Sequence, residues 1–213
     1  MTTVAGFVFN PFQENTYVVY DETNDCVIID PGCQSTIEQQ VLIDFISSEN
    51  LIPVKLINTH CHIDHILGNH FVYKQFGLLP EMHKEELPVL EAASSYGSQF
   101  GMQLEPSPGP VVFHKDGDVI RFGNTELAVL YTPGHSPGEI SLFNEKQDFV
   151  IAGDVLFQQS IGRTDLPGGD YDTLINSIKT KLLTLDDHVK VYSGHGPEST
   201  IGFERTNNPF LQN

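Results

Sequence analysis

The chain has 213 residues and is acidic, with 28 Asp and Glu against 11 Lys and Arg and a formal net charge of −17. Because nucleic-acid phosphates are bound by basic surfaces, this balance argues against a nucleic-acid partner, and it argues equally against an anionic membrane. We expect one domain over residues 1–213, since no linker or like-charge run divides the chain.

The sequence also predicts a cellular location. Its first residues lack the basic and apolar regions of a signal peptide, and no run approaches the ~20 apolar residues that cross a bilayer. Three cysteines form no paired disulfide framework, which is typical of a reducing compartment. We therefore expect a cytoplasmic protein.

The first part of the chain predicts strands followed by helices. Short runs rich in Val, Ile, Phe and Tyr indicate strands at 6–9, 16–20 and 26–29. Ser35 followed by Glu38 predicts the start of a helix. We assign its apolar face to Ile37, Val41, Phe45 and Ile46. A strand at 54–57 and a helix at 65–76, ended by Gly77, are expected next.

The middle of the chain is the least regular part. A short helix is expected at 90–96, and the segment 97–110 is either a lid over a site or a surface insertion. Two strand pairs are then predicted, 119–122 with 126–130 and 140–143 with 149–152. The last expected elements are a helix at 171–185 and a strand at 189–192. This order fits two β-sheets packed face to face with helices outside.

Three histidines and an aspartate follow the expected strand at 54–57 directly, in the phrase THCHIDH at 59–65. They are His60, His62, Asp64 and His65. Because side chains alternate along an extended chain, His60 and His62 project to one side and Cys61 to the other. Asp64 and His65 fall where the chain turns into a helix and leave in another direction. Four such groups aimed at two neighbouring points indicate two cations, and their donors suit zinc, iron or manganese.

Three further ligand-type residues occur downstream, each beside a glycine and after an apolar segment. They are His135, Asp154 and His195. Glycine lets the backbone turn sharply and approach an ion, and apolar strands give the loops a rigid base. A single Gly-His or Gly-Asp is typical of an ordinary turn. In series, these residues predict ligands that converge on one edge of a sheet.

This ordered set of residues resembles the metallo-β-lactamase fold superfamily over nearly the whole chain. Within it, TPGHSPG at 132–138, GDVLF at 153–157, GHGP at 194–197 and NPF at 208–210 are similar to the glyoxalase II group of thioester hydrolases. The resemblance implies an α/β (α+β) fold of the four-layer αββα sandwich type. It also implies a binuclear metal-dependent hydrolase.

The resemblance further implies a role for each ligand-type residue. One metal would be held by His60, His62 and His135, a second by Asp64, His65 and His195, with Asp154 bridging them. Asp30, in the phrase IIDPG at 28–32, matches the first motif of the family and would orient a ligand from behind. An Asp before Pro-Gly is also typical of a simple turn, so both interpretations of Asp30 stay open.

Two cations roughly 3.5–4 Å apart can share a water, lower its pKa and hold a hydroxide as nucleophile, so no serine or cysteine nucleophile is required. We expect Asp64 and Asp154 to act in catalysis with that metal-bridging hydroxide, which attacks a thioester carbonyl. The leaving thiol, with a pKa near ~8.5, departs without a dedicated general acid. Zinc is the first expectation for both metals, with iron or manganese as alternatives.

The chain departs from the fuller glyoxalase II pattern at its end. Those enzymes carry a C-terminal helical domain with basic residues that grip glutathione, whereas only 18 positions follow His195 here. The chain is more similar to the compact hydrolases of this group, so the expected partner is a small-molecule thioester similar to hydroxyacylglutathione, with another small ester also open. The alternative is a persulfide dioxygenase of the same fold with a single iron. Its GRTD phrase is present at 162–165, where Arg163 either anchors a substrate or, as we prefer, pairs with Asp165.

Overall fold

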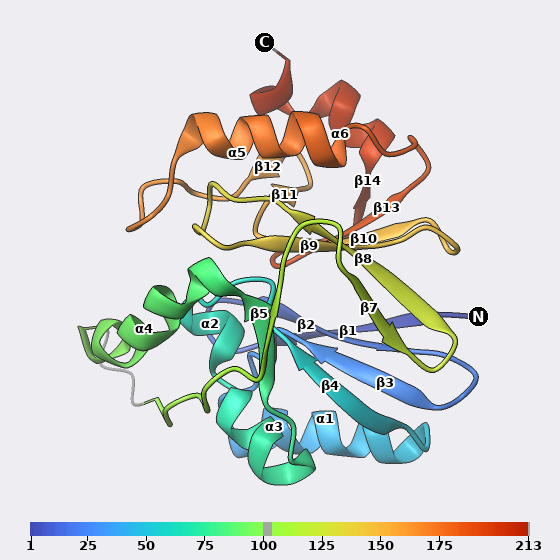
Figure 1. Ribbon diagram of the computed structural model, residues 1–213, viewed down its shortest axis with the longest axis vertical. Helices are drawn as coiled ribbons and strands as arrows, with labels where there is room; N and C mark the ends of the chain where they lie inside the picture. The colour runs from blue at the N-terminus through green and yellow to red at the C-terminus, as the bar shows by residue number, and fades with distance from the viewer. Residues whose placement is uncertain (100–103, 213) are drawn as a thin grey trace.

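Two β-sheets packed face to face form the centre of the structure, and helices cover their outer faces (Figure 1). The computed structural model describes residues 1–99 and 104–212. The arrangement confirms the four-layer αββα sandwich that the resemblance implied.

Strands from the first part of the chain pair in sequence order to form the first sheet. Its strands are β1 (Thr3–Phe9), β2 (Glu14–Tyr20), β3 (Asp25–Ile29), β4 (Ile52–Ile57), β5 (Pro80–His83) and β6 (Val112–His114). In spatial order, the strands of the second sheet are β14 (Ser199–Thr200), β13 (Lys190–Ser193), β10 (Phe149–Gly153), β9 (Ile140–Asn144), β8 (Thr125–Tyr131) and β7 (Val119–Phe122). A short hairpin of β11 (Leu156–Phe157) and β12 (Ser160–Ile161) follows β10.

The helices fall into three groups. The first sheet is covered by α1 (Thr36–Ser48) and α3 (Asn69–Phe76). The second sheet is covered by α5 (Tyr171–Ser177), its π-helical continuation η2 (Ile178–Leu182), α6 (Ile201–Asn207) and the turn η3 (Pro209–Leu211). At one end of the molecule lie α2 (Ile63–Ile66), the 3-10 turn η1 (Lys84–Glu86) and α4 (Leu87–Gln99) (Figure 1). No helix in these described ranges is long and apolar enough to cross a membrane.

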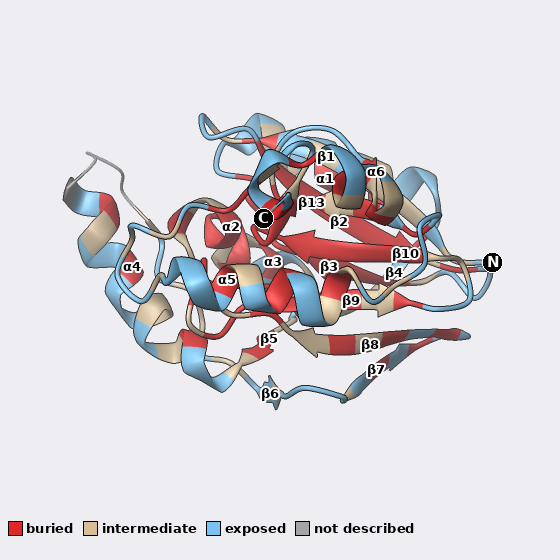
Figure 2. Cartoon of the chain, turned by 90° about the horizontal axis from the view of Figure 1, so that it is seen from above, coloured by how far each residue is buried: buried red, intermediate tan, exposed pale blue. Residues whose placement is uncertain are grey.

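Alternating side chains on the strands build the three apolar layers of the core. On β2, Tyr17 and Val19 point between the sheets, whereas Val18 packs under α1 and α3. On β10, Ile151 points between the sheets and Val150 packs under α5. Because each central strand is covered on both sides, its residues are buried almost throughout, whereas β6 is largely exposed (Figure 2).

The helix expected at 65–76 is two helices, and the prediction of one continuous helix was wrong. The chain breaks at Gly68, whose backbone N–H donates to Pro31 O at 2.6 Å. A Cβ at Gly68 would lie 2.6 Å from Cys33 Sγ, so the backbone can pass this close only as glycine. The predicted end at Gly77 is confirmed, since Gly77 has a φ of 73° and closes α3.

Three other boundaries differ from the expectation. The helix expected at 90–96 extends over Leu87–Gln99, so part of the segment assigned to a lid or insertion is helical. Residues 100–103 of that segment lie outside the described residues. The helix expected at 171–185 ends at Leu182 after changing to a π-helical turn. The sequence interpretation missed α6, which Thr200 caps by accepting from Phe203 N.

The start of α1 is confirmed, and its buried face was predicted in part, since Ile46 is buried and Phe45 packs against the same apolar layer. Ser35 and Glu38 form the expected capping box. Ile37 is 77% exposed and Val41 is 44% exposed, whereas Leu42 is fully buried. The buried face therefore includes Leu42 and not Val41, because Leu42 fits the apolar layer below the first sheet.

The Leu42→Ala substitution should lower the free energy of unfolding by about 2–5 kcal/mol, because it leaves a cavity in that layer. The matched Val41→Ala substitution, on the exposed side of the same helix, should change it by about 0.5 kcal/mol or less. Urea denaturation followed by circular dichroism measures both. Equal losses in the two variants would contradict this orientation of α1.

Candidate metal centre

Parallel strand pairing brings the ligand-type residues to one edge of the two sheets. β3 pairs parallel with β4, and β10 pairs parallel with β13, so the loops that leave their carboxyl ends meet. Two backbone hydrogen bonds join the sheets at this edge, from Ile140 N to Thr59 O at 2.9 Å and from Asn15 N to Gly194 O at 2.7 Å. The convergence predicted from the sequence is therefore present.

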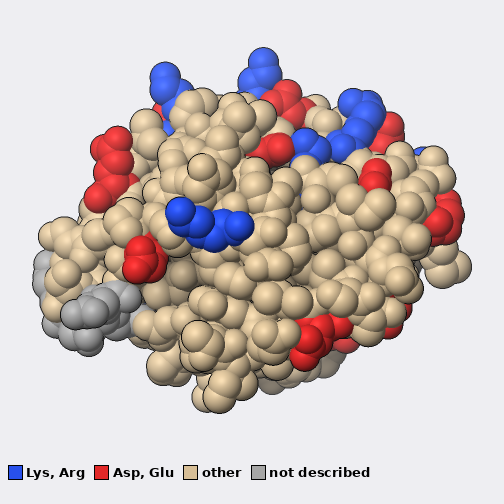
Figure 3. Space-filling model, turned by 90° about the horizontal axis from the view of Figure 1, so that it is seen from below, with Lys and Arg blue, Asp and Glu red and all other residues tan. Residues whose placement is uncertain are grey.

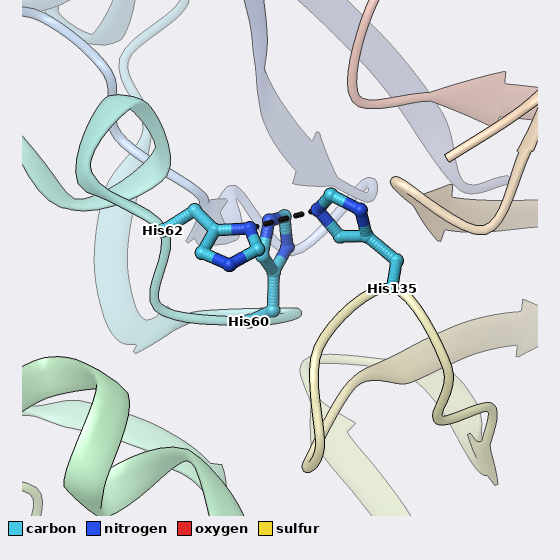
Figure 4. A group of neighbouring side chains, drawn as sticks. All are labelled: His60, His62 and His135. Carbon is cyan, nitrogen blue, oxygen red and sulfur yellow. Dashed lines mark hydrogen bonds between the residues drawn. The ribbon is translucent and has the colours of Figure 1, made fainter. Parts of the chain in front are cut away.

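A first group of three histidines comes from two loops. The nitrogen atoms of His60, His62 and His135 all lie within 4.8 Å of one another. Figure 4 shows the rings turned toward one point, with His62 Nδ1 2.8 Å from His135 Nε2. His60 and His62 thus project to a common side, and Cys61 Sγ points away to Met82 Sδ at 3.6 Å, as strand alternation predicted.

A second group lies beside the first. Asp64, His65 and His195 also offer ligand atoms within 4.8 Å of one another. His195 Nε2 is 3.1 Å from Asp64 Oδ2, and His65 Nε2 is 3.7 Å from the same oxygen. Asp64 and His65 lie within α2, so their side chains point in a different direction from those of His60 and His62, as expected.

Asp154 stands between the two groups. Its Oδ2 is 3.4 Å from His135 Nε2 and 3.6 Å from His195 Nε2, and its Oδ1 is 3.5 Å from His65 Nε2. Gly194 allows this position, because a Cβ there would lie 2.1 Å from Asp154 Oδ1. The carboxylate therefore faces both histidine groups.

Buried acceptors behind the histidines fix their ring orientations. Asp30 Oδ2 lies 3.2 Å from His65 Nδ1, and Asp30 also accepts from the backbone N–H of Thr59 at 2.7 Å. Asp30 holds a φ of 48°, a conformation that a residue other than glycine adopts at a cost. Its contacts support the orienting interpretation over that of a simple turn. Glu139 Oε1 lies 3.5 Å from His60 Nδ1.

Two backbone carbonyl groups contact His135 and His195. His135 Nδ1 is 2.7 Å from Arg163 O, and His195 Nδ1 is 3.1 Å from Phe12 O. Each contact leaves Nε2 free to face the centre.

Several buried atoms of the centre are not satisfied by hydrogen bonds in the described parts of the chain. His60 Nε2, His65 Nε2 and Asp154 Oδ1 are buried and form no hydrogen bond there. A buried polar atom without a partner normally costs stability, so these atoms fit a site that binds an additional charged group. Imidazole nitrogen and carboxylate oxygen are donors suited to zinc, iron or manganese.

The protonation of the two groups differs. Burial lowers the pKa of His62 to about 3, and it also lowers the pKa of His60 and of His135. These imidazoles are therefore neutral at pH 7, which is the form that binds metal. Burial opposes a charge on His65 too, but carboxylates led by Asp154 outweigh it and hold the pKa of His65 well above its usual range. The second group thus holds a positive charge on His65, at a position where a bound cation could replace it.

The centre opens into a cleft of about 450 Å³. Phe12, Phe157 and Ile161 line it together with the candidate ligands. Arg163 also lines the cleft, and it forms two hydrogen bonds of 2.7 Å with the carboxylate of Asp165. This pairing was preferred from the sequence and is confirmed, but both side chains are exposed rather than buried.

Glu86, which the sequence interpretation did not single out, ties the two loops of the first group together. Its Oε2 accepts from the backbone N–H of Cys61 at 2.7 Å, between His60 and His62. Its Oε1 accepts from Ser136 Oγ and Gly138 N, both at 2.6 Å, next to His135. Nothing in the run KEE at 84–86 distinguishes this buried glutamate from its exposed neighbour Glu85.

The Glu86→Ala substitution should lower the free energy of unfolding by about 3 kcal/mol or more, because it leaves three buried donors unsatisfied at roughly 1–3 kcal/mol each. It should also weaken metal binding, since both loops of the first group lose their common anchor. Glu86→Gln, which keeps one oxygen acceptor, should lose less, and Glu85→Ala should behave like the parent chain. Chemical denaturation and chelator competition provide the two measurements.

Comparisons with known proteins agree with this geometry. The family model described as the Metallo-beta-lactamase superfamily matches residues 9–195. The probable metallo-hydrolase YqgX of Bacillus subtilis is 40% identical over 203 residues, which are 94% of this chain and 93% of the relative. The hydroxyacylglutathione hydrolase GloC of Haemophilus influenzae is 35% identical over 206 residues, with the same shares of each chain.

Solved structures show the same relationship. The BLEG-1 B3 metallo-beta-lactamase matches with a TM-score of 0.91 and 36% identity over 99% of this chain and 100% of the other. TTHA1623 in a di-iron-bound form matches with a TM-score of 0.88 and 35% identity over 98% of this chain and 100% of the other. The chain is thus a member of the metallo-beta-lactamase superfamily.

Proposed function

We propose that this protein is a binuclear metal-dependent hydrolase that cleaves a thioester. The observation that carries the proposal is the position of Asp154, whose two carboxylate oxygens lie 3.4–3.6 Å from histidines of both groups. A carboxylate shared in this way is suited to bridging two cations. Membership of a superfamily of metallo-hydrolases supports the hydrolase part, and the name of the relative GloC supports a thioester as substrate.

In this proposal, His60, His62 and His135 hold one cation, and Asp64, His65 and His195 hold the other, with Asp154 between them. When bound, the two cations supply Lewis acidity for a carbonyl oxygen and acidify a shared water. Zinc is the first candidate, and the di-iron form of TTHA1623 keeps iron as a strong second one.

The chain supplies positioning and proton transfer. Asp64 lines the cleft with its Oδ2 beside His195 Nε2, so this oxygen is placed to accept the proton that an attacking water loses. Asp30 holds the ring of His65 in place, and Thr59 Oγ1, 3.1 Å from His60 Nδ1, holds the ring of His60. The thiol leaves as a thiolate, because its pKa near ~8.5 is low enough for departure without an acid from the protein.

The structure bears on the identity of the thiol as well. Among the described residues that line the cleft, the side chain of Arg163 is the lone Lys or Arg, and Asp165 already pairs with it. A glutathione carboxylate therefore has no ready cationic partner in the cleft. We propose a thioester hydrolase in the broad sense, with hydroxyacylglutathione as one candidate substrate.

The alternative of a mononuclear-iron persulfide dioxygenase is less well supported. A single iron site would leave one of the two ligand groups without a function, whereas Asp64 and His195 approach each other at 3.1 Å. Likeness to a B3 metallo-beta-lactamase favours a second candidate substrate, the amide of a β-lactam, for the same centre.

Other expectations stay predictions. They are the single domain over residues 1–213, the cytoplasmic location, and the absence of nucleic-acid and membrane partners. On the face drawn in Figure 3, Lys and Arg side chains do not form one continuous basic surface, which supports the prediction on nucleic acid.

Asp154→Asn should reduce the metal content from two ions per chain to one or none. It should also lower kcat/KM for thioesters by at least about 100-fold, which is the largest loss usual for a residue that contacts a metal ligand but not the metal. Asp186→Asn, an exposed position outside the cleft lining, is the matched control and should leave both unchanged. Elemental analysis and thiol release provide the readouts. Full metal content and activity in Asp154→Asn would refute the bridging role.

A substrate panel separates the reaction classes. The metal-loaded parent chain should release free thiol from thioesters, with two metals per chain and no oxygen uptake. One iron per chain with oxygen consumption and sulfite formation from a persulfide would instead establish the dioxygenase. A β-lactam belongs in the same panel, and faster opening of its ring than of any thioester would replace the thioester proposal.

A further inference from the structure

A second cavity, of about 310 Å³, adjoins the cleft of the metal centre. We call it the side pocket. It lies between α4, which contributes Val89, Ala92 and Tyr96, and the segment 166–168 that precedes α5. Figure 1 shows α4 and that segment at the same end of the molecule.

The side pocket and the cleft share part of their lining. His62, Ile63, Tyr96 and Leu166 line both spaces. His62 also belongs to the first histidine group, so the junction of the two spaces lies at the candidate metal centre. A substrate whose reacting carbon sits at the centre can therefore extend a substituent into the side pocket.

The lining of the side pocket selects an apolar substituent. Its residues are aliphatic, proline, glycine and cysteine apart from His62 and Tyr96, and no Asp, Glu, Lys or Arg is among them. A charged or strongly polar group would lose its water there without gaining a charged partner. Apolar cavities of about 150 Å³ hold a molecule as large as benzene, so this one has room for a short acyl chain or an aromatic ring.

We propose that the side pocket binds the apolar acyl group of the substrate, and that the preferred substrates are thioesters of short unbranched or aromatic carboxylic acids. This inference rests on the proposed function. A hydroxyacyl group such as lactoyl suits the pocket less well than its deoxy counterpart, because its hydroxyl would be desolvated among apolar side chains. The side pocket thus sets acyl specificity.

The acyl group and not the thiol is assigned to the side pocket because of where the cleft opens. The His195 side chain is 26% exposed and that of His135 is 3% exposed, while His62, at the junction with the side pocket, has intermediate exposure. The thiol leaves together with the group attached to it, so we assign it to the end of the cleft near His195. The carbonyl substituent then points past His62.

Thioesters of N-acetylcysteamine test the assignment, with acetyl, propionyl, lactoyl, butyryl, hexanoyl and benzoyl groups. We expect kcat/KM to rise about fourfold for each added methylene up to hexanoyl, the factor that corresponds to ~0.8 kcal/mol per buried methylene. Propionyl should exceed lactoyl about tenfold, as expected for an uncompensated buried hydroxyl. A second series, acetyl thioesters of ethyl to hexyl thiols, should stay flat.

Ala92→Phe fills the side pocket from an exposed position of α4, so the helix should tolerate it. It should lower the ratio of hexanoyl to acetyl kcat/KM at least about tenfold. Ala92→Leu should show a smaller effect in the same direction. Ser95→Phe, also exposed on α4 but outside both linings, should leave the series unchanged.

A binding measurement keeps this inference separate from the proposed function. Calorimetric titration of the metal-loaded chain should show hexanoate binding at least about tenfold more tightly than acetate, with the difference lost in Ala92→Phe and kept in Ser95→Phe. If thioesters are cleaved but the acyl series is flat, or rises with the thiol instead, the assignment is wrong and the hydrolase stands. If no thioester is cleaved but hexanoate binds as stated, the pocket stands and the hydrolase does not. Equal binding of hexanoate and acetate overturns the pocket in either case.

Discussion

The parallel pairing of β3 with β4 and of β10 with β13 is the constraint on which the candidate metal centre depends. Because these strands run in the same direction within each sheet, their carboxyl ends deliver Asp30, the loop 58–65, Asp154 and His195 to one edge. The apolar layer between the sheets fixes how far apart those ends lie. Ligand loops from distant parts of the chain are therefore positioned by the packing of residues that never touch the centre.

The charges of the histidines and carboxylates also shape the candidate metal centre. The centre collects histidines and carboxylates that are largely buried, and unpaired buried charges are costly. Carboxylates surround His65 and make its positive form favourable, while burial keeps the histidines of the first group neutral. Three buried atoms that form no hydrogen bond in the described parts of the chain are the places where we propose that cations bind.

Much of the fold and of the candidate site could be predicted from the sequence. Nine strands were found because β-branched and aromatic runs end in turn residues, whereas the short strands β5, β6, β11, β12 and β14 were missed. The seven ligand-type residues meet because the segments that carry them follow strands. The helix break at Gly68 was missed because it arises from contact with Pro31 and Cys33, which are distant in sequence. The prediction that Val41 lies on the buried face of α1 was wrong for a similar reason. Val41 and Leu42 are equally apolar, and packing against the sheet decides which of them is buried. Glu86 carries no local signal at all, because its partners come from two other loops.

Glu86 has a consequence beyond the loops that it joins. It ends the turn η1, and α4, one wall of the side pocket, begins at the next residue. The first turn of that helix is thus anchored to the ligand loops, whereas Val89, Leu90 and Ala93 pack on the apolar cluster around Met82. Natural variation in substrate preference should accordingly accumulate toward the distal turns of α4, where a change in side-chain size reshapes the pocket wall without shifting the histidines.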